Sequence, residues 1–253
     1  MSAAPVLVVT GASRGIGAAT ALLAAERGYA VVVNYSTSVE AAERICATIH
    51  QRGGSAVAVR GDVSEPEDVE HIFAAADRLG PLKGLVNNAG VVGTEARVET
   101  FDAERINRIL RVNVTGSFLC AIAAIKRMST RHGGTGGGIV NLSSGASKVG
   151  SPAVYVDYAA SKGAIDTFTV GLALEVAGEG IRVNSVRPGI IDTEIHAAAG
   201  DPDRAKRMGP TLPIPRFGTA EEVARSILWL LSDEASYTTG TCISVTGGRA
   251  ILP

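Results

Sequence analysis

Short runs of β-branched residues alternate along the chain with longer Ala-rich segments, and this alternation limits the possible folds more than any other feature. It predicts strands over residues 6–9, 30–35, 55–63, 84–90, 137–144, 181–189 and 242–248. It predicts helices over residues 15–28, 39–52, 65–80, 101–131, 153–178 and 220–232. Apolar strands that alternate with helices are typical of a parallel sheet covered on both faces. We therefore predict an α/β fold in which residues 1–253 form one doubly wound domain.

The composition is consistent with one sizeable core and argues against several classes of partner. The chain has 253 residues, of which 46% are hydrophobic, and its formal net charge is −1. A nearly neutral chain without a run of Lys or Arg indicates no nucleic-acid partner and no recruitment to an acidic membrane. Three separated cysteines and four scattered histidines predict neither disulfides nor a metal site. Without a basic N-terminal region or an apolar stretch of membrane-spanning length, we expect a cytoplasmic protein.

The segment TGASRGIG, residues 10–17, stands between the first predicted strand and the first predicted helix. In doubly wound folds, ligands bind beyond the carboxyl ends of the strands. We expect Gly11 to permit a tight turn, Gly15 to admit a pyrophosphate, and Gly17 to let the helix lie close to the strand. The helix N-terminus would offer free N–H groups to the phosphates. The motif, spaced G-x-x-x-G-x-G, predicts a dinucleotide site; the alternative is a merely structural turn.

No acidic residue stands at the end of the second predicted strand, where a carboxylate would bind the ribose 2′-hydroxyl of NAD. Asn34, Tyr35 and Ser36 occupy that position instead. A carboxylate would repel a 2′-phosphate, whereas the guanidinium of Arg14 could bind one. We therefore predict NADP(H) as cofactor, with NAD possible. The alternative is a solvated Arg14 and use of both cofactors.

The later strand–helix junctions supply further candidates for cofactor binding. Asp62 could accept a hydrogen bond from the adenine amino group while Val63 packs on the ring. Asp62 could instead cap a helix, although Ser64 is the better candidate for the N-cap. The other residues that we assign to the cofactor lie in the glycine loop or follow the later strands: Ser13, Ile16, Asn88, Ala89, Gly90, Pro188, Gly189, Ile191 and Thr193.

Two tyrosines and a lysine stand in VYVDYAASKG, residues 154–163. Residues i and i+4 of a helix lie on one face, about 5–6 Å apart at Cβ, which pairs Tyr158 with Lys162 and gives Tyr155 no such partner. A nearby ammonium lowers the pKa of a phenol from about 10 and tunes it for proton exchange with a substrate oxygen. The pair predicts an acid–base catalyst; the alternative is a packed tyrosine beside a snorkelling lysine.

Two more polar residues are candidates for the same site. Ser144 ends the strand 137–144, where its hydroxyl could stabilise charge on a substrate oxygen. Asn113 stands among apolar residues of the helix 101–131. We expect Asn113 to mark a kink, to be a satisfied core amide, or to hold a water that feeds protons to Lys162.

Together these residues resemble the short-chain dehydrogenase/reductase family. The matching elements follow the family's order over nearly the whole chain: TGASRGIG (10–17), NNAG (87–90), Asn113, NLSS (141–144), YAASK (158–162) and RPG (187–189). The resemblance implies a Rossmann fold with a seven-stranded sheet, a nicotinamide cofactor and a catalytic tetrad, here Asn113, Ser144, Tyr158 and Lys162. It implies hydride transfer to a carbonyl carbon, protonation of the oxygen by Tyr158, and a Lys162 that binds the ribose and lowers the phenol pKa. Members are commonly homotetramers that pair through two long helices.

The resemblance leaves several points open. The spacer between Ser144 and Tyr158 is slightly longer than in many members, so Ser143 remains an alternative to Ser144. Subtypes include sugar 1-dehydrogenases and 3-oxoacyl-carrier-protein reductases. A non-catalytic nucleotide-binding regulator or structural subunit is the other class, against which the intact tetrad argues. We predict that the irregular segment 190–218 is a substrate lid and the least ordered part without ligand.

A carrier-protein partner would need a basic landing patch near the site. The candidates for such a patch are Arg127, Arg131, Arg204, Lys206 and Arg207. Scattered basic residues are usually solvated surface, so the sequence leaves a carrier protein possible but unsupported.

Overall fold

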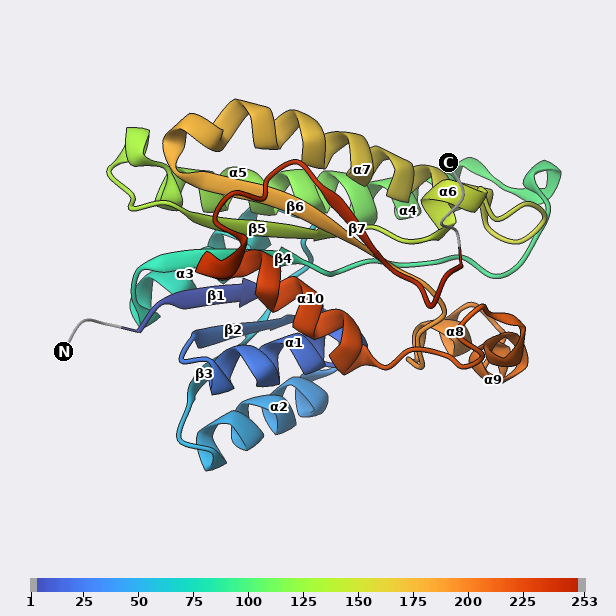
Figure 1. Ribbon diagram of the computed structural model, residues 1–253, viewed down its shortest axis with the longest axis horizontal. Coiled ribbons are helices and arrows are strands. Elements are labelled where there is room, and N and C mark those ends of the chain that lie inside the picture. The colour runs from blue at the N-terminus through green and yellow to red at the C-terminus, as the bar shows by residue number, and fades with distance from the viewer. Residues whose placement is uncertain (1–3, 250–253) are drawn as a thin grey trace.

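The computed structural model describes residues 4–249 and contains the predicted parallel sheet (Figure 1). Seven strands pair in the order β3-β2-β1-β4-β5-β6-β7, and every pair is parallel. The strands are β1 (Val6–Val9), β2 (Ala30–Tyr35), β3 (Ser55–Arg60), β4 (Leu82–Asn87), β5 (Gly137–Leu142), β6 (Ile181–Pro188) and β7 (Cys242–Val245). The strand order reverses between β1 and β4, which is where doubly wound sheets bind ligands.

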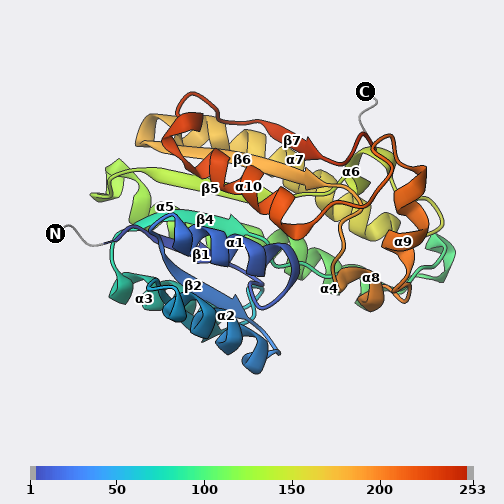
Figure 2. The same ribbon diagram turned by 60° about the horizontal axis from the view of Figure 1, so that its bottom comes forward.

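Helices cover both faces of the sheet (Figures 1 and 2). The main ones are α1 (Gly15–Glu26), α2 (Val39–Gln51), α3 (Pro66–Leu79), α4 (Ala103–Leu110), α5 (Gly116–Met128), α7 (Val156–Val176) and α10 (Ala220–Leu231). Shorter helices are α6 (Ala146–Val149), α8 (Ile195–Ala198) and α9 (Arg204–Met208). Single 3₁₀ turns lie at Val98–Thr100, Thr130–His132, Ala177–Glu179, Gly209–Thr211 and Asp233–Ala235.

Alternation within each strand divides the core into two layers. Val6 and Val8 of β1 point to the layer formed by α3, α5 and α7, whereas Leu7 and Val9 point to the layer of α1, α2 and α10. Successive strand residues face opposite sides of a sheet, so a strand between two helical layers must be apolar throughout. All four residues of β1 are fully buried, which explains the uninterrupted apolar run that predicted it.

The structure corrects several predicted boundaries. The predicted helix 101–131 spans Ala103–Met128 and is not α-helical throughout, because a π-helix at Arg111–Thr115 lies between α4 and α5. The predicted helix 153–178 begins only at Val156, since Ser151 and Ala153 have positive φ and cannot continue a right-handed helix. Ser64 is not the N-cap of α3. Glu65 holds that position, and the Ser64 hydroxyl donates to Asp62 Oδ1 at 2.7 Å instead.

The helical run Ala103–Met128 is long and apolar enough to cross a membrane, by length and composition alone. We expected no such stretch, and that expectation was wrong. One such helix is weak evidence for a span, because core helices pass the same test. Here the buried face of α5 packs on the sheet through Cys120, Ala124 and Met128.

A chain of buried amide and hydroxyl groups ties β4 and β5 to α5 and α7. The Asn87 side-chain amide donates to the Ser117 carbonyl at 3.1 Å and to Asn141 Oδ1 at 2.9 Å. Asn141 in turn donates to Thr169 Oγ1 at 3.0 Å. The Thr169 hydroxyl donates to the Ile165 carbonyl, which closes the chain. Because these groups are buried, each needs its partner.

This network gives a stability test with a matched control. Thr169→Val leaves the Asn141 amide without its acceptor, so we expect the free energy of unfolding to fall by about 1–3 kcal/mol. Thr48 also donates a hydrogen bond to the carbonyl four residues earlier, but on an exposed helix face. Thr48→Val should therefore change the free energy of unfolding by at most about 0.5 kcal/mol. Urea unfolding compares the two variants. Equal losses would contradict the importance of the buried network.

Candidate functional site

A cleft of about 750 Å³ lies along the carboxyl ends of the strands, where the sequence places its site. Its lining includes every residue that we assigned to the cofactor except Gly17: Gly11, Ser13, Arg14, Gly15, Ile16, Asn34, Tyr35, Ser36, Asp62, Val63, Asn88, Ala89, Gly90, Tyr158, Lys162, Pro188, Gly189, Ile191 and Thr193. Parallel strands end at one edge, so loops that are far apart in sequence meet there. The structure thus brings nearly the whole predicted set together.

The loop after β1 needs its glycines for different reasons. Gly11 and Gly15 have φ of 60° and 54°, a left-handed conformation that glycine adopts without strain. A Cβ on Gly17 would lie 2.5 Å from Nδ2 of Asn88 and 2.6 Å from the Gly11 carbonyl oxygen. The close packing at Gly17 is therefore with its own loop and Asn88, rather than with the strand as we expected. The lack of a side chain at Gly17 therefore lets the loop after β1 pack against Asn88.

Asn34 fixes the glycine loop from the neighbouring strand. Its side chain is buried, with Oδ1 accepting from the Gly11 N–H at 3.2 Å and Nδ2 donating to the Gly61 carbonyl at 3.0 Å. Because both of its polar atoms are hydrogen-bonded to backbone groups, the Asn34 side chain holds the loops after β1 and β3 in place. The polar side chains that open into the cleft after β2 are therefore those of Ser36, Thr37 and Ser38. No carboxylate stands between residues 34 and 38.

Two more of the predicted residues shape the loops of the cleft. Asp62 accepts from both the backbone N–H and the hydroxyl of Ser64, at 2.9 and 2.7 Å, so its carboxylate organises the turn after β3. The Asn88 amide donates to the carbonyl oxygens of Thr10 and Gly11, which links the loops after β1 and β4. Both residues still border the cleft.

Asn113 lies in the π-helix, and its side-chain amide is bonded on both atoms. Oδ1 accepts from the Val91 N–H at 2.7 Å, while Nδ2 donates to the Val91 carbonyl at 2.9 Å and to Ser161 Oγ at 3.0 Å. The helix irregularity and the satisfied core amide that we considered are thus both present. Asn113 joins the loop after β4 to α7, the helix that carries Tyr158.

Tyr158 and Lys162 share one face of α7, as their spacing predicts. Lys162 is buried, and its Nζ donates to the Leu142 carbonyl at 2.6 Å and lies 5.7 Å from the centre of the Tyr158 ring. Burial lowers the pKa of Lys162 to about 8, against an opposing effect of Asp166. Burial raises the pKa of Tyr158 to about 12, although a hydrogen bond with Ser144 lowers it. The predicted lowering of the phenol pKa is therefore not seen in this structure.

The two candidate serines differ in orientation. Ser143 is buried, and its hydroxyl donates to the Lys162 carbonyl at 3.1 Å. Ser144 borders the cleft, and its Oγ accepts from the Ala146 N–H at 3.1 Å. Ser144 and Tyr158 both line the cleft, so one substrate oxygen could contact both hydroxyls.

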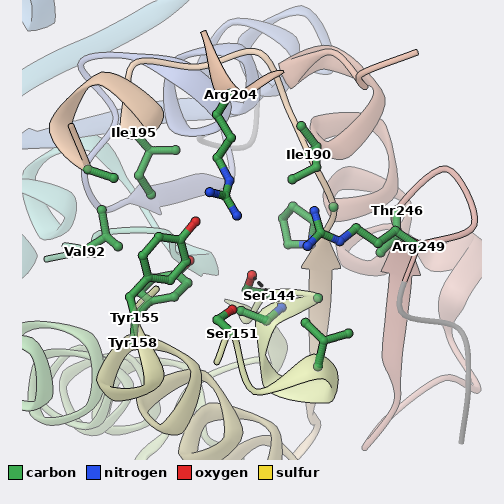
Figure 3. A pocket seen from close by; sticks show the side chains of 16 residues that line it. Val92, Ser144, Ser151, Tyr155, Tyr158, Ile190, Ile195, Arg204, Thr246 and Arg249 are labelled. Carbon is green, nitrogen blue, oxygen red and sulfur yellow. Dashed lines mark hydrogen bonds between the residues drawn. The ribbon is translucent and has the colours of Figure 1, made fainter. Parts of the chain in front are cut away.

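A second cavity, of about 90 Å³, adjoins the cleft at Ser144, Tyr158 and Gly189 (Figure 3). Tyr155 lines this cavity and meets Tyr158 edge-on, with ring centres 5.8 Å apart, which fits the expectation that Tyr155 forms a wall. Four polar residues of its lining were not among our predicted site residues: Ser151, Arg204, Thr246 and Arg249. No local motif marks them, since they come from three segments that are far apart in the sequence.

Comparison with known proteins gives consistent matches over the whole chain. Residues 11–250 match a model of the short-chain dehydrogenase/reductase family described as Enoyl-(Acyl carrier protein) reductase. "Uncharacterized oxidoreductase YgfF" of Escherichia coli is 56% identical over 245 residues, which cover 96% of this chain and 99% of that protein. "Glucose 1-dehydrogenase 2" of Bacillus subtilis is 39% identical over 247 residues, covering 97% and 95%. A dehydrogenase/reductase structure from Sinorhizobium meliloti superimposes with a TM-score of 0.89 at 32% identity, covering 99% and 96%.

The buried lysine gives a pH-dependent stability prediction. With a pKa near 8 in the folded protein and about 10.5 when unfolded, Lys162 destabilises the fold below pH 8, and this cost disappears as the pH rises from 8 through 10.5. At pH 7 the cost is about 3 kcal/mol. We expect Lys162→Met to raise the free energy of unfolding at pH 7 and to have a smaller effect at pH 10. Urea unfolding at both pH values measures this.

The control is Lys126→Met, which removes an exposed lysine from α5 and should change stability by at most about 0.5 kcal/mol at either pH. A Lys162→Met gain that does not shrink between pH 7 and pH 10 would show that ionisation of Lys162 is not the cause.

Proposed function

The chain belongs to the short-chain dehydrogenase/reductase family, and we propose that it is an NADP(H)-dependent oxidoreductase of a carbonyl or secondary-alcohol substrate. One observation carries the proposal: Ser144 and Tyr158 line both the large cleft and the small cavity. A cofactor in the first and a substrate in the second would meet at these two hydroxyls. When bound, the nicotinamide supplies the hydride to the carbonyl carbon or accepts it in the reverse direction.

The cleft fits a nicotinamide dinucleotide in its shape and in its chemistry. Gly11 and Gly15 form a left-handed loop at the N-terminus of α1, where backbone N–H groups favour a pyrophosphate. At the other end, a Cβ on Gly90 would lie 3.6 Å from Lys162 Nζ, so a side chain there would lie against that ammonium. Lys162 would hold the ribose hydroxyls there, while Pro188 and Gly189 would border the nicotinamide.

In this proposal Tyr158 gives its proton to the substrate oxygen as the carbonyl is reduced. Its raised pKa keeps the phenol protonated at neutral pH, so the proton that it would give is present. Ser144 would donate a second hydrogen bond to the same oxygen. Asn113 would hold α7 and the loop after β4 in register and support a water that leads to Lys162.

The acid role of Tyr158 is tested against its neighbour. Tyr158→Phe removes the only proton donor in this assignment, so kcat should fall by about a thousandfold or more while NADPH affinity changes little. Tyr155→Phe also removes one phenol hydroxyl from the cavity and should keep kcat within about tenfold. NADPH oxidation with a ketone substrate measures both. Comparable losses in the two variants would contradict the assignment.

The preference for NADP(H) is supported by the absence of a carboxylate after β2 and by Arg14, which borders the cleft at the start of α1. A guanidinium–phosphate contact contributes about 1.5–3 kcal/mol. We expect Arg14→Ala to weaken NADPH binding about tenfold or more and NADH binding by less than about threefold, as measured by cofactor fluorescence. Arg27→Ala, at the opposite end of α1, is the control. An unchanged ratio of NADPH to NADH affinity would refute the role of Arg14.

The remaining functional assignments are also proposals. We propose that residues 1–253 act as one catalytic domain in the cytoplasm, and that segment 190–218 closes over the substrate. It carries α8 and α9 and packs through Ile190, Ala205 and Leu212. We further propose a homotetramer that pairs through α5 and α7. Large apolar side chains are exposed on both helices, namely Phe118, Ile122, Val170 and Leu174.

The structure offers little support for a carrier-protein landing patch. Each of the five basic residues considered for it is ion-paired within the chain: Arg127 with Asp77, Arg131 with Glu179, Arg204 with Glu95, Lys206 with Asp203 and Arg207 with Asp201. Arg204 also points inward instead of lying on the surface. We therefore favour a free small-molecule substrate over an acyl chain delivered by a protein.

A further inference from the structure

Two arginine side chains reach the small cavity from different walls (Figure 3). Arg204 comes from α9, and Arg249 comes from the segment that follows β7. Both guanidinium groups point toward the space beside Tyr155 and Ser144. Arginines on the surface of a protein ordinarily extend into water, so two that turn into one small cavity require an explanation.

Arg204 is only partly satisfied by the protein. Its side chain is 12% exposed, its Nη1 donates to Glu95 at 2.6 Å, and its guanidinium lies 5.3 Å from the centre of the Tyr155 ring. Its Nε is buried and has no hydrogen-bond partner in the described part of the chain. A buried N–H without a partner is costly, which indicates that something other than protein completes this group.

Arg249 is less satisfied still. Its Nη1 is buried without a hydrogen-bond partner, and no carboxylate of residues 4–249 forms an ion pair with it. Burial lowers the pKa of Arg249, and the positive charge of Arg204 lowers it further, while Tyr155 opposes both. Two like charges close enough to affect each other thus share a partly buried site.

The neighbouring acids do not neutralise this pair. Glu95 bonds Arg204 from a half-exposed position, and Asp201, 3.9 Å from Arg204, is shared with Arg207. Neither Glu95 nor Asp201 forms an ion pair with Arg249. The cavity therefore keeps an unmatched positive charge and two unused donors, Nε of Arg204 and Nη1 of Arg249. Guanidinium donors of this kind bind carboxylate and phosphate oxygens strongly.

We infer that the substrate is a small carbonyl compound or alcohol bearing a carboxylate or phosphate group, which Arg249 and Arg204 bind while Tyr158 and Ser144 bind the reacting oxygen. This inference rests on the proposed oxidoreductase function and adds a substrate class to it. Reduction would form a C–H bond at the carbonyl carbon with the hydride, and the carbonyl oxygen would take the Tyr158 proton. The product is then a hydroxy acid or a hydroxyalkyl phosphate.

The size of the cavity limits the rest of the molecule. Its volume of about 90 Å³ is well below the roughly 150 Å³ of an engineered cavity that holds benzene. Val92, Ile190 and Ile195 supply apolar wall for a few carbon atoms. A short carbon chain between the carbonyl and the anionic group fits this space, whereas a fused-ring substrate does not.

The test compares charged and neutral forms of the same carbonyl compound. Initial rates with NADPH are measured for 2-oxobutanoate, 3-oxobutanoate and 4-oxopentanoate, each beside its methyl ester, and for dihydroxyacetone phosphate beside dihydroxyacetone. We expect at least one anion to exceed its neutral partner in kcat/KM by about tenfold or more. The carboxylate and phosphate arms show which anion the site prefers.

Variants assign this preference to the arginines. Arg249→Gln should remove most of the preference by raising KM for the anion while turnover of the neutral partner remains, and Arg249→Lys should restore part of it. Lys206→Gln, which removes an exposed charge from α9, should leave the preference unchanged. Neutral compounds that react as well as their anions in the wild-type protein would overturn the inference, as would a preference that survives Arg249→Gln.

Calorimetry separates this inference from the proposed function. Binding of 4-oxopentanoate and of its methyl ester is measured with NADP⁺-saturated wild-type protein and with Arg249→Gln. If no compound is turned over but the anion binds selectively through Arg249, the reductase assignment fails and the anion site stands. If ketones are turned over but the anion does not bind selectively, the reductase assignment stands and the anion site fails.

Discussion

Parallel pairing of all seven strands is the constraint on which the rest of this structure depends. Because every strand runs in the same direction, every carboxyl end lies at one edge, and the loops that follow must share that edge. The loops after β1, β2 and β3 form one half of the cleft, while those after β4, β5 and β6 form the half that contains Tyr158. The proposed cofactor and substrate sites therefore adjoin as a consequence of topology, before any individual side chain is considered.

Holding that edge in place requires polar groups inside the fold. Asn34, Asn88 and Asn113 each use a side-chain amide to join backbone segments from different junctions. Lys162 is the costly member of this set, since a buried ammonium at neutral pH opposes folding. Within residues 4–249, the ammonium donates one hydrogen bond, to the Leu142 carbonyl, and so does not use all three of its donors. The destabilised group lies where the proposed chemistry needs it, as is common for functional sites.

Much of this was predictable from local patterns. The alternation of apolar strands with helices predicted the parallel sheet. Helical spacing separated Tyr158, which has Lys162 one turn later, from Tyr155. Features that arise from tertiary contacts were not predictable. The π-helix around Asn113 interrupts a pattern that is typical of one helix. Arg204 and Arg249 turn inward from segments 45 residues apart in the sequence, which no local pattern indicates. Ser143 and Ser144 are neighbours with the same side chain, so the sequence could not tell which one faces the cleft. Their different hydrogen-bond partners in the fold distinguish them.

The most direct test of the account is a crystal structure of the protein with NADP⁺ and a short-chain hydroxy acid. We expect the nicotinamide between Tyr158 and Pro188–Gly189, the 2′-phosphate at Arg14, the ribose at Lys162 and the carboxylate at Arg249. The substrate carbon should then lie about 3–3.5 Å from C4 of the nicotinamide. A nicotinamide bound away from Tyr158, or a substrate whose carboxylate avoids both arginines, would contradict the arrangement proposed for this site.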